Sequence, residues 1–416
     1  MLATQFTKIF LIVLFLKSLI ESVLDKRNYN HILTNRNIVP EQFKEHIKLE
    51  DHQKAADYSI EKIKVSQIFH FINLIIFLAL TIGGGIEYLT RISLTFNLNE
   101  KFSGLVFFGL LGVVTSLLSL PESIYFTFVI EEKYGFNKTT WKIFIIDMIK
   151  GAFLAILLGG PIIYGILAIM EKMGTNWWLY AFTFLTLVQL IMIFIYPTII
   201  APLFNKFTEL PEGEIKNKIL ELLKRCDFKS SGLFVMDASK RSSHGNAYFT
   251  GFGKSKRIVF FDTLLNSLDP EEIESVLAHE LGHMKKKHIL KSMILSFIMS
   301  FIGFYILSIL KNNPLFFEGH GVLTQTNANI LTIFSMVASV YTFLFTPVSA
   351  WFSRKNEYEA DQFASEYASA EKLITALVKM YNDNKSSLTP DPIYSKFYYS
   401  HPPALERVQF LEKCKK

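Results

Sequence analysis

The chain has very little cysteine: Cys226 and Cys414 are the only two among its 416 residues. Two thiols so far apart in the sequence do not make a disulfide framework, and they are too few for a metal site built from thiolates. We therefore expect both cysteines to be bystanders, and any metal ligands to come from other residue types.

Charged residues are also scarce. They make up 19% of the chain, whereas hydrophobic residues make up 50% and phenylalanine alone contributes 39 residues. This is more apolar surface than one soluble core of this length buries, so the composition predicts a membrane protein in contact with a lipid bilayer. The net charge of +6 does not indicate a nucleic-acid partner, because the Lys and Arg residues lie in loops between apolar runs, with acids interleaved and no recognition motif.

Seven apolar runs are close to the length that crosses a hydrocarbon core of about 30 Å. They cover residues 6–24, 68–89, 102–120, 143–170, 177–200, 289–310 and 330–351. The first run lacks a small-residue cleavage site, so we expect a membrane span and not a signal peptide. It contains Lys17 and Glu21, which either face each other or extend separately toward the membrane boundary. Pro161 and Pro197 are expected to kink the spans that contain them.

The sequence HELGH at residues 279–283 has the form HExxH. On a helix, the imidazoles of His279 and His283 project from one face and can share a Zn²⁺ ion, with Glu280 beside the metal. Asp269 and Pro270 are an N-cap and a first-turn proline, so a helix from Pro270 through the motif is well signalled. The pattern predicts a zinc hydrolase, in which a third protein ligand comes from elsewhere and a carboxylate takes the proton of a water molecule.

The motif closes the longest polar region of the chain. Within that region we expect a helix at residues 214–225 and strands at 232–236, 245–250 and 257–262. We divide the chain into five transmembrane helices at 1–200, a catalytic region at 201–288, two transmembrane helices at 289–352 and a tail at 353–416 that completes the zinc site. The expected fold is mainly α: a polytopic membrane protein with seven transmembrane helices and a small α+β metalloprotease region on the cytoplasmic face.

The distribution of basic residues predicts the orientation. If the region 202–288 is cytoplasmic, the loops on the opposite face carry only Arg91, Lys101, Lys172 and Lys311. Almost every other Lys and Arg then lies inside, which is the usual asymmetry of membrane proteins. Seven spans also return the tail to the side of the HExxH motif, so the tail can supply the third ligand.

The segment directly after the motif does not supply that ligand. The long metzincin form needs Gly at position 286 and His at position 289, where this chain has Lys286 and Ile289. His288 is one residue off that register, and we expect it to face solvent or phosphate headgroups.

The tail offers three acids soon after the last span: Glu357, Glu359 and Asp361. On a helix Glu359 lies about 200° round from Glu357, so these two do not face one metal, whereas Glu357 and Asp361 share a face. The longer Glu357 reaches further and is the expected ligand. Asp361 is placed to hold the far nitrogen of a ligand imidazole, and Glu359 is expected to contribute little.

At this point the chain resembles the type I CAAX prenyl protease family, membrane-embedded zinc metallopeptidases with seven spans and a cytosol-facing site. The resemblance covers nearly the whole sequence. It rests on HQKAADY at 52–58, VIEEKYGFN at 129–137, APLFNKF at 201–207, SSHGNAYFTG at 242–251, HELGH, the run 353–361, and SHPP at 400–403 with Glu406 and Arg407. It implies that the spans enclose a large water-filled chamber.

The resemblance also implies the composition of the metal site. His279, His283 and Glu357 would bind one Zn²⁺ per chain, Glu280 would be the general base, and Asp361 would support a zinc-bound imidazole from behind.

Three further roles rest on the resemblance alone. Asn246 would grip the substrate backbone, and His401 and Arg407 would stabilise the oxyanion. Taken only as residues, Asn246 is a strand-edge amide, His401 a turn residue before two prolines, and Arg407 a cation on a helix surface. His244 lies close to Asn246 and stays unassigned.

The implied substrate is a peptide or protein with a lipidated C-terminus. The loop 312–329 and the tail are short, and the segment HGNAYFTGFGKSKRIVFFDTLL at 244–265 is more similar to the bacterial branch of the family than to its eukaryotic one. This favours a bacterial inner membrane over the endoplasmic reticulum membrane. A quality-control endopeptidase without a prenylated substrate is the natural alternative. A transporter or channel with a structural zinc is a third possibility, but structural sites tend to close the metal with four protein ligands.

Overall fold

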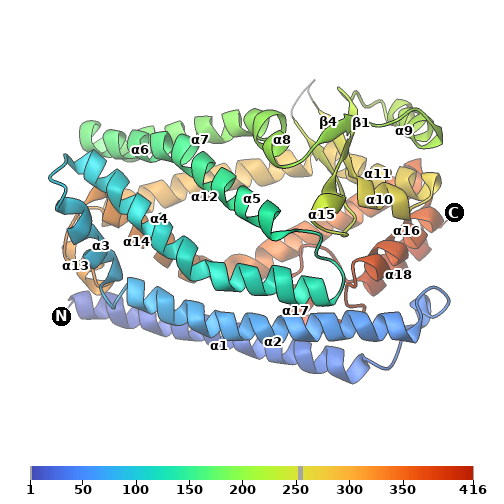
Figure 1. The fold of residues 1–416 in the computed structure, drawn as a ribbon, viewed down its shortest axis with the longest axis horizontal. Coiled ribbons are helices and arrows are strands. Elements are labelled where there is room, and N and C mark those ends of the chain that lie inside the picture. The colour runs from blue at the N-terminus through green and yellow to red at the C-terminus, as the bar shows by residue number, and fades with distance from the viewer. Residues whose placement is uncertain (1, 252–255, 416) are drawn as a thin grey trace.

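The computed structural model describes residues 2–251 and 256–415, so residues 252–255 of the expected catalytic region lie outside the described residues. Long helices run side by side along the molecule, and the β-sheet lies at one end (Figure 1). We call this the sheet end, formed by residues 207–251, 256–285 and 370–414. The chain begins at the opposite end and finishes at the sheet end.

Helices form most of the molecule. The elements outside the sheet end are α1 (Leu2–Asn35), α2 (Leu49–Leu80), α3 (Gly85–Leu94), α4 (Glu100–Tyr125), α5 (Trp141–Leu154), α6 (Gly160–Lys172), α7 (Trp177–Ile195), α8 (Ala201–Phe204), α12 (His288–Leu310), α13 (Pro314–Gly319), α14 (Asn327–Thr342) and α15 (Thr346–Tyr367). Wide π-helical turns, η3 (Ala155–Gly159) and η5 (Tyr196–Ile200), lie at the expected kinks at Pro161 and Pro197. A proline ring displaces the carbonyl one turn back, and a wider turn accommodates that displacement.

Six helical segments in the described residues are long and apolar enough to cross a membrane: Leu49–Leu80, Glu100–Glu131, Trp141–Lys172, Gly174–Phe204, His288–Leu310 and Asn327–Tyr367. The seventh expected span lies within α1, a 34-residue helix that packs against α2 but carries more charge along its apolar stretch. Lys17 and Glu21 of α1 face each other, with the ammonium nitrogen 3.0 Å from the carboxylate. The two side chains therefore face each other and do not extend separately toward the membrane boundary.

Two expected spans differ from the observed helices. The apolar run at 68–89 is not one helix: α2 begins at Leu49 and ends at Leu80, and α3 begins at Gly85, because the chain turns through Gly84 in the left-handed region, with φ 79°. The run at 330–351 does not end in a loop but continues as one 41-residue helical segment to Tyr367. This continuity places Glu357 and Asp361 on the extension of a candidate membrane span.

A four-stranded sheet lies at the sheet end. Its strands are β1 (Phe207–Glu209), β2 (Leu233–Met236), β3 (Ala247–Thr250) and β4 (Arg257–Phe261), in the order β1-β2-β4-β3. β2 and β4 are parallel, and the other two pairs are antiparallel. The three predicted strands differ from β2, β3 and β4 only at their ends, whereas β1 is too short for its pattern to signal a strand. β3 is an edge strand.

The HExxH helix lies among the helices of this end, and it packs on α9 and α16 and on α15. They are α9 (Glu214–Arg225), α10 (Asp262–Ser267), α11 (Pro270–Lys285), α16 (Ala370–Asp383), α17 (Pro392–Tyr398) and α18 (Ala404–Cys414). The predicted helix at 214–225 is α9. One buried apolar cluster joins Leu222 of α9, Phe260 of β4, and Leu277 and Leu281 of α11. Helix α11 is thus held in the core by the face opposite to its histidines.

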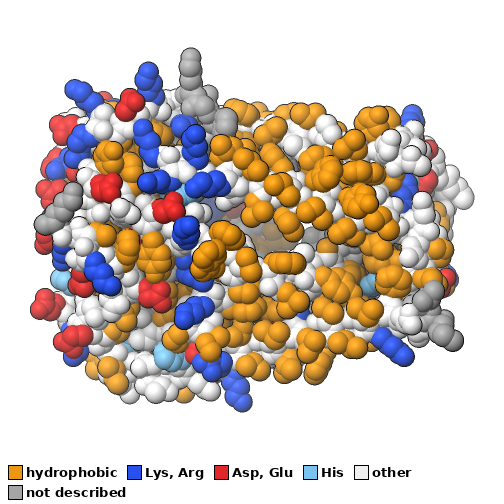
Figure 2. Space-filling view, turned by 180° about the vertical axis from the view of Figure 1, so that it is seen from behind, with side chains coloured by type: hydrophobic (Ala, Val, Ile, Leu, Met, Phe, Trp, Pro, Cys, Tyr) orange, Lys and Arg blue, Asp and Glu red, His pale blue; other side chains and the backbone are white. Residues whose placement is uncertain are grey.

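Side chains are sorted by type along the molecule. Figure 2 shows hydrophobic side chains over the middle of the surface, and Lys, Arg, Asp and Glu gathered toward the sheet end. An exposed apolar belt matches the hydrocarbon core of a bilayer, and charged side chains avoid it. The sheet end therefore lies outside the hydrocarbon.

Candidate metal centre

Helix α11 carries both histidines of the motif. It starts with a capping box, in which the Glu272 carboxylate accepts a hydrogen bond from the Asp269 backbone N–H at 2.8 Å. Capping fixes the first turn, and the buried apolar face fixes the rotation of the helix. As a result His279 and His283 point to the same side, and their Nε2 atoms are 3.2 Å apart.

Helix α15 brings the third candidate ligand to this pair. The two helices approach so closely at Gly282 that an added Cβ would lie 2.9 Å from the Cα of Ala360. The Glu357 carboxylate lies over the histidines, with one oxygen 3.4 Å from His279 Nε2 and the other 3.3 Å from His283 Nε2. The glycine of the motif, Gly282, is therefore a requirement of the packing.

The geometry of these three residues fits zinc. Tetrahedral ligands at about 2.0–2.1 Å from Zn²⁺ lie roughly 3.3 Å from one another. The two imidazole Nε2 atoms are 3.2 Å apart, and each has one Glu357 oxygen at a similar distance, Oε2 for His279 and Oε1 for His283. The Oε2 atom of Glu357 is buried and has no hydrogen-bond partner, and such an atom is costly unless something binds it. Two imidazoles and one carboxylate are also the donor set of catalytic zinc sites, which keep one position open.

A buried ion pair lies behind His279. Asp361 Oδ1 is 2.7 Å from His279 Nδ1, and Arg407 donates to both oxygens of Asp361, at 2.9 and 2.5 Å. Burial and the Arg407 charge lower the pKa of His279, but hydrogen bonds to Asp361 and Glu357 outweigh them and raise it to about 9. Asp361 therefore fixes the ring so that Nε2 faces Glu357.

Two of the three donor groups of Arg407 are used on Asp361. The third, Nη1, is 4.0 Å from Glu357 Oε2. The oxyanion role expected for Arg407 is not tested by these contacts and stays a prediction. The contacts add a structural role, which is to neutralise the fully buried Asp361.

A different pair lies behind His283. Its Nδ1 is 3.0 Å from His288 Nδ1, and His288 Nε2 is 3.0 Å from Glu359 Oε2. The expectation that His288 faces solvent or headgroups is wrong, because its side chain is 3% exposed. Helix α11 ends before it, and Lys287 in the left-handed region, φ 59°, reverses the chain. The register of a continuous helix therefore does not apply to His288.

The sequence did contain a signal for this turn. Three lysines follow the motif at residues 285–287, and basic residues gather in the last turn of helices. Glu359 points away from Glu357, as its helical position predicts, yet it reaches the centre indirectly through His288.

Glu280 lies between the two histidines in sequence and is half-buried. Burial raises the pKa of its carboxyl group, which the neighbouring histidines lower to a smaller extent. It makes no hydrogen bond with any residue that the structure describes. A carboxylate in this position is free to bind a water molecule and take its proton.

The remaining candidates come from the tail and from the segment that leads into β3. His401 Nε2 is 3.4 Å from Glu357 Oε1, and its side chain is 61% exposed. Asn246 is exposed at the start of the edge strand β3, where its side-chain oxygen accepts from the Ala247 N–H at 2.8 Å. His244, which was left unassigned, stacks on Phe136 with ring centroids 4.1 Å apart. The structure thus brings His401 to Glu357, one of the candidate metal ligands, and places Asn246 directly before the edge strand β3.

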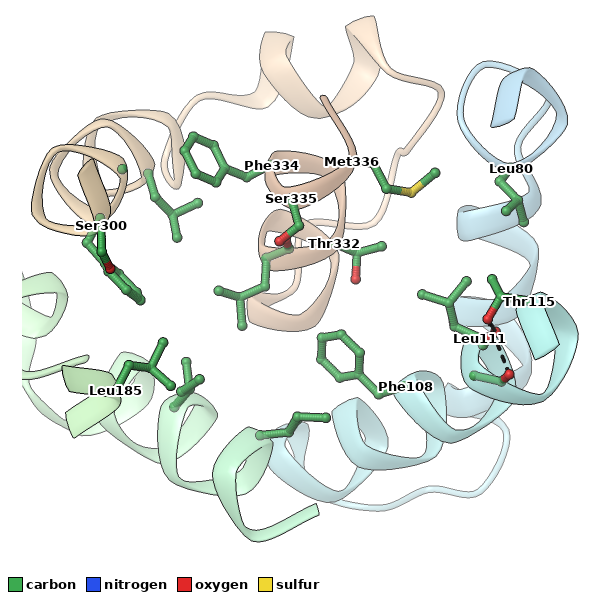
Figure 3. Close-up of a pocket in the computed structure, with 17 residues that line it drawn as sticks. Leu80, Phe108, Leu111, Thr115, Leu185, Ser300, Thr332, Phe334, Ser335 and Met336 are labelled. Atoms are coloured by element: carbon green, nitrogen blue, oxygen red, sulfur yellow. Dashed lines mark hydrogen bonds between the residues drawn. The ribbon is translucent and has the colours of Figure 1, made fainter. Parts of the chain in front are cut away.

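Two cavities lie outside the cluster itself. A polar one of about 620 Å³ is lined by His401, His244 and several tyrosines. An apolar one of about 680 Å³ lies between the spans, and Figure 3 shows Phe108 and Leu111 of α4, Leu185 of α7 and Phe334 of α14 around it. The apolar cavity contains none of the residues of the metal centre.

A helical membrane frame that presents HExxH and a distant glutamate at one end defines a membrane metallopeptidase. Two family models match the chain: "CAAX prenyl protease N-terminal, five membrane helices" over residues 28–206 and "Peptidase family M48" over residues 209–415. The chain belongs to peptidase family M48, in the group of the CAAX prenyl proteases, and is a membrane metalloendopeptidase.

The relatives agree over most of their length. The chain is 36% identical to CAAX prenyl protease 1 of Saccharomyces cerevisiae over 94% of this chain and 92% of that protein. It is 43% identical to the CAAX prenyl protease 1 homolog of rice, Oryza sativa, over 76% and 74%. The crystal structure of S. mikatae Ste24p superposes with a TM-score of 0.90 at 35% identity, over 98% of both chains.

These findings confirm the family and the mainly helical membrane fold that the sequence predicted. They favour a peptidase over a transporter or channel. The relatives described above are eukaryotic, and they do not test the similarity to the bacterial branch.

Proposed function

We propose that this chain is a zinc endopeptidase that cleaves near the C-terminus of prenylated CAAX-type proteins. The single observation that carries the proposal is the cluster of His279, His283 and Glu357, with mutual separations of 3.2 to 3.4 Å and one unpartnered buried carboxylate oxygen. The names of the relatives, CAAX prenyl proteases, support the substrate class.

The residues divide the chemistry among them. Zinc bound by His279, His283 and Glu357 would polarise a water molecule and the scissile carbonyl. Glu280 takes the proton of that water and returns it to the leaving amine. His401, exposed beside Glu357, is placed to donate a hydrogen bond to the oxyanion as charge develops.

The surroundings of the centre support an extended peptide as substrate. Among the described residues β3 pairs with β4 alone, so its second edge offers backbone groups that a peptide can bind as an added strand. Asn246 at the start of this strand is placed to hold the peptide backbone. The apolar cavity between the spans suits a hydrocarbon group at membrane depth.

We also propose that the sheet end faces the cytoplasm. The few basic residues in the opposite loops support this orientation. The eukaryotic relatives favour the endoplasmic reticulum membrane and lend no support to a bacterial inner membrane.

The test compares two peptides with the same sequence, one farnesylated at its CAAX cysteine and one not, with the purified full chain in detergent. We expect zinc-dependent cleavage of the farnesylated peptide, and Glu280→Gln to lower turnover at least ~10²-fold while zinc stays bound. Equal cleavage of the unmodified peptide would favour the quality-control alternative. Near-normal cleavage by the Glu280→Gln variant would reject the mechanism.

A further inference from the structure

The two candidate zinc histidines are held from behind in different ways. His279 donates directly to a carboxylate, that of Asp361, which is fully buried. His283 has no carboxylate at its far nitrogen. It meets a second imidazole, His288, and only beyond that ring a carboxylate, Glu359, whose side chain is 33% exposed.

The hydrogen positions in this chain of contacts follow from its outer end. The ionised carboxylate of Glu359 only accepts, so His288 must donate from Nε2. A neutral His288 then has a bare Nδ1, which accepts from the N–H at His283 Nδ1. This leaves the lone pair of His283 on Nε2, the atom that lies 3.3 Å from Glu357 Oε1. Glu359 thus fixes the tautomer of His288, and His288 fixes the tautomer of His283 that leaves Nε2 free to bind a metal.

The position of His288 is specific for this contact. It is the first residue of α12, directly after the left-handed turn at Lys287 that folds it back under α11. Its ring packs edge-on against the His283 ring, with centroids 5.1 Å apart. A buried polar ring at the start of an apolar helix is costly unless both nitrogens are paired, and both are paired here.

We propose that His288 and Glu359 are positioning residues that orient His283 and fix its tautomer for the metal. The proposal rests on the proposed zinc site at His279, His283 and Glu357. Three separate elements meet in this relay, α11, α12 and α15, so it ties one zinc ligand to the start of a candidate membrane span. One candidate ligand, His279, is therefore held by a fully buried carboxylate, Asp361. The other, His283, is held through His288 by a partly exposed carboxylate, Glu359.

The test measures zinc affinity by competition with a chelator on the purified full chain. We expect His288→Phe and Glu359→Ala each to weaken zinc binding by ~10- to 100-fold, the usual loss when an outer partner of a ligand is removed. Glu359→Gln should recover part of this loss, because its amide oxygen still accepts from His288. Glu366→Ala, on an exposed residue of the same helix, is the matched control and should bind zinc like the unmodified chain.

Two further measurements distinguish positioning from a general effect on folding. The double variant His288→Phe with Glu359→Ala should lose no more affinity than either single variant, because both act through one path. The visible spectrum of the Co²⁺-loaded protein should shift in the single variants, while the melting temperature of the metal-free protein stays within a few degrees of the control.

The outcomes separate the two proposals. Zinc affinity unchanged in both single variants would overturn the relay while the zinc site stands. If His288→Phe does not fold, the Glu359 variants decide alone. Failure of the unmodified chain to bind zinc would overturn the proposed function together with the relay.

Discussion

At the scale of single residues, the buried ion pair of Asp361 and Arg407 stands behind the candidate metal centre. Asp361 is fully buried and depends on Arg407, which is itself 5% exposed. A buried ion pair adds little net stability, but removal of one partner leaves an uncompensated charge. We therefore expect the loss of one partner to lower the stability of the protein more than the intact pair raises it.

Arg407→Met should lower the free energy of unfolding by about 3–5 kcal/mol, because Asp361 loses the buried guanidinium that donates to both of its oxygens. Thermal unfolding of the metal-free protein in detergent measures the effect. The double variant Arg407→Met with Asp361→Asn should be more stable than Arg407→Met alone, and an equal or lower melting temperature would contradict this explanation.

Substitution of the two acids of α15, Glu357 and Asp361, should reduce zinc binding to different extents. Glu357→Ala removes a proposed ligand and should abolish both bound zinc and activity. Asp361→Ala should weaken zinc binding by roughly 10- to 100-fold, since it supports His279 from behind. Metal content and chelator competition on purified variants check this, and full zinc in the Glu357 variant would mean that another group completes the site.

At the scale of elements, the contact of α11 with α15 determines the centre. Gly282 and Ala360 set the distance between these helices, and this distance decides whether Glu357 reaches the histidines. Overpacked contacts of this kind are relieved only by backbone movement.

Gly282→Ala should therefore weaken zinc binding and destabilise the protein by about 1–3 kcal/mol, although Ala is the better helix former. Gly109→Ala on α4 is the matched control, because an added Cβ meets nothing within 4 Å there. Zinc affinity and melting temperature are measured for both variants. A Gly282→Ala protein that behaves like the control would show that the two helices adjust without cost.

At the scale of the whole molecule, the chain separates a charged end from an apolar middle (Figure 2). The two termini lie at opposite ends (Figure 1), which agrees with an odd number of crossings, six from the apolar segments and one from α1. The candidate metal centre lies toward the charged end.

The orientation is tested with single cysteines in a chain whose Cys226 and Cys414 are replaced by serine. A cysteine at the exposed Asn312 should react with an impermeant maleimide added on the non-cytoplasmic side. A cysteine at the exposed Asn217 of α9 should react only after permeabilisation. The reverse labelling pattern would invert the proposed topology.

The sequence alone determined the features that depend on neighbours along the chain. The HExxH helix from Pro270, helix α9 and the apolar spans follow from local periodicity and from capping residues, and α9 was predicted at its observed ends. The family was predicted from a set of short sequence motifs that occur in a fixed order along the chain. Local patterns are sufficient here because helix formation and membrane crossing require only a run of suitable residues.

Only the tertiary structure decided which side chains meet. Arg407 lies 128 residues from His279 along the chain, yet Arg407 Nη2 is 3.3 Å from His279 Nδ1. Glu359 and His288 are 71 residues apart and share a hydrogen bond, although the sequence pattern predicts a solvent-facing or headgroup-facing His288 and little contribution from Glu359. No local pattern contains this information, because it depends on how a left-handed turn at Lys287 and the close approach at Gly282 set three helices against one another.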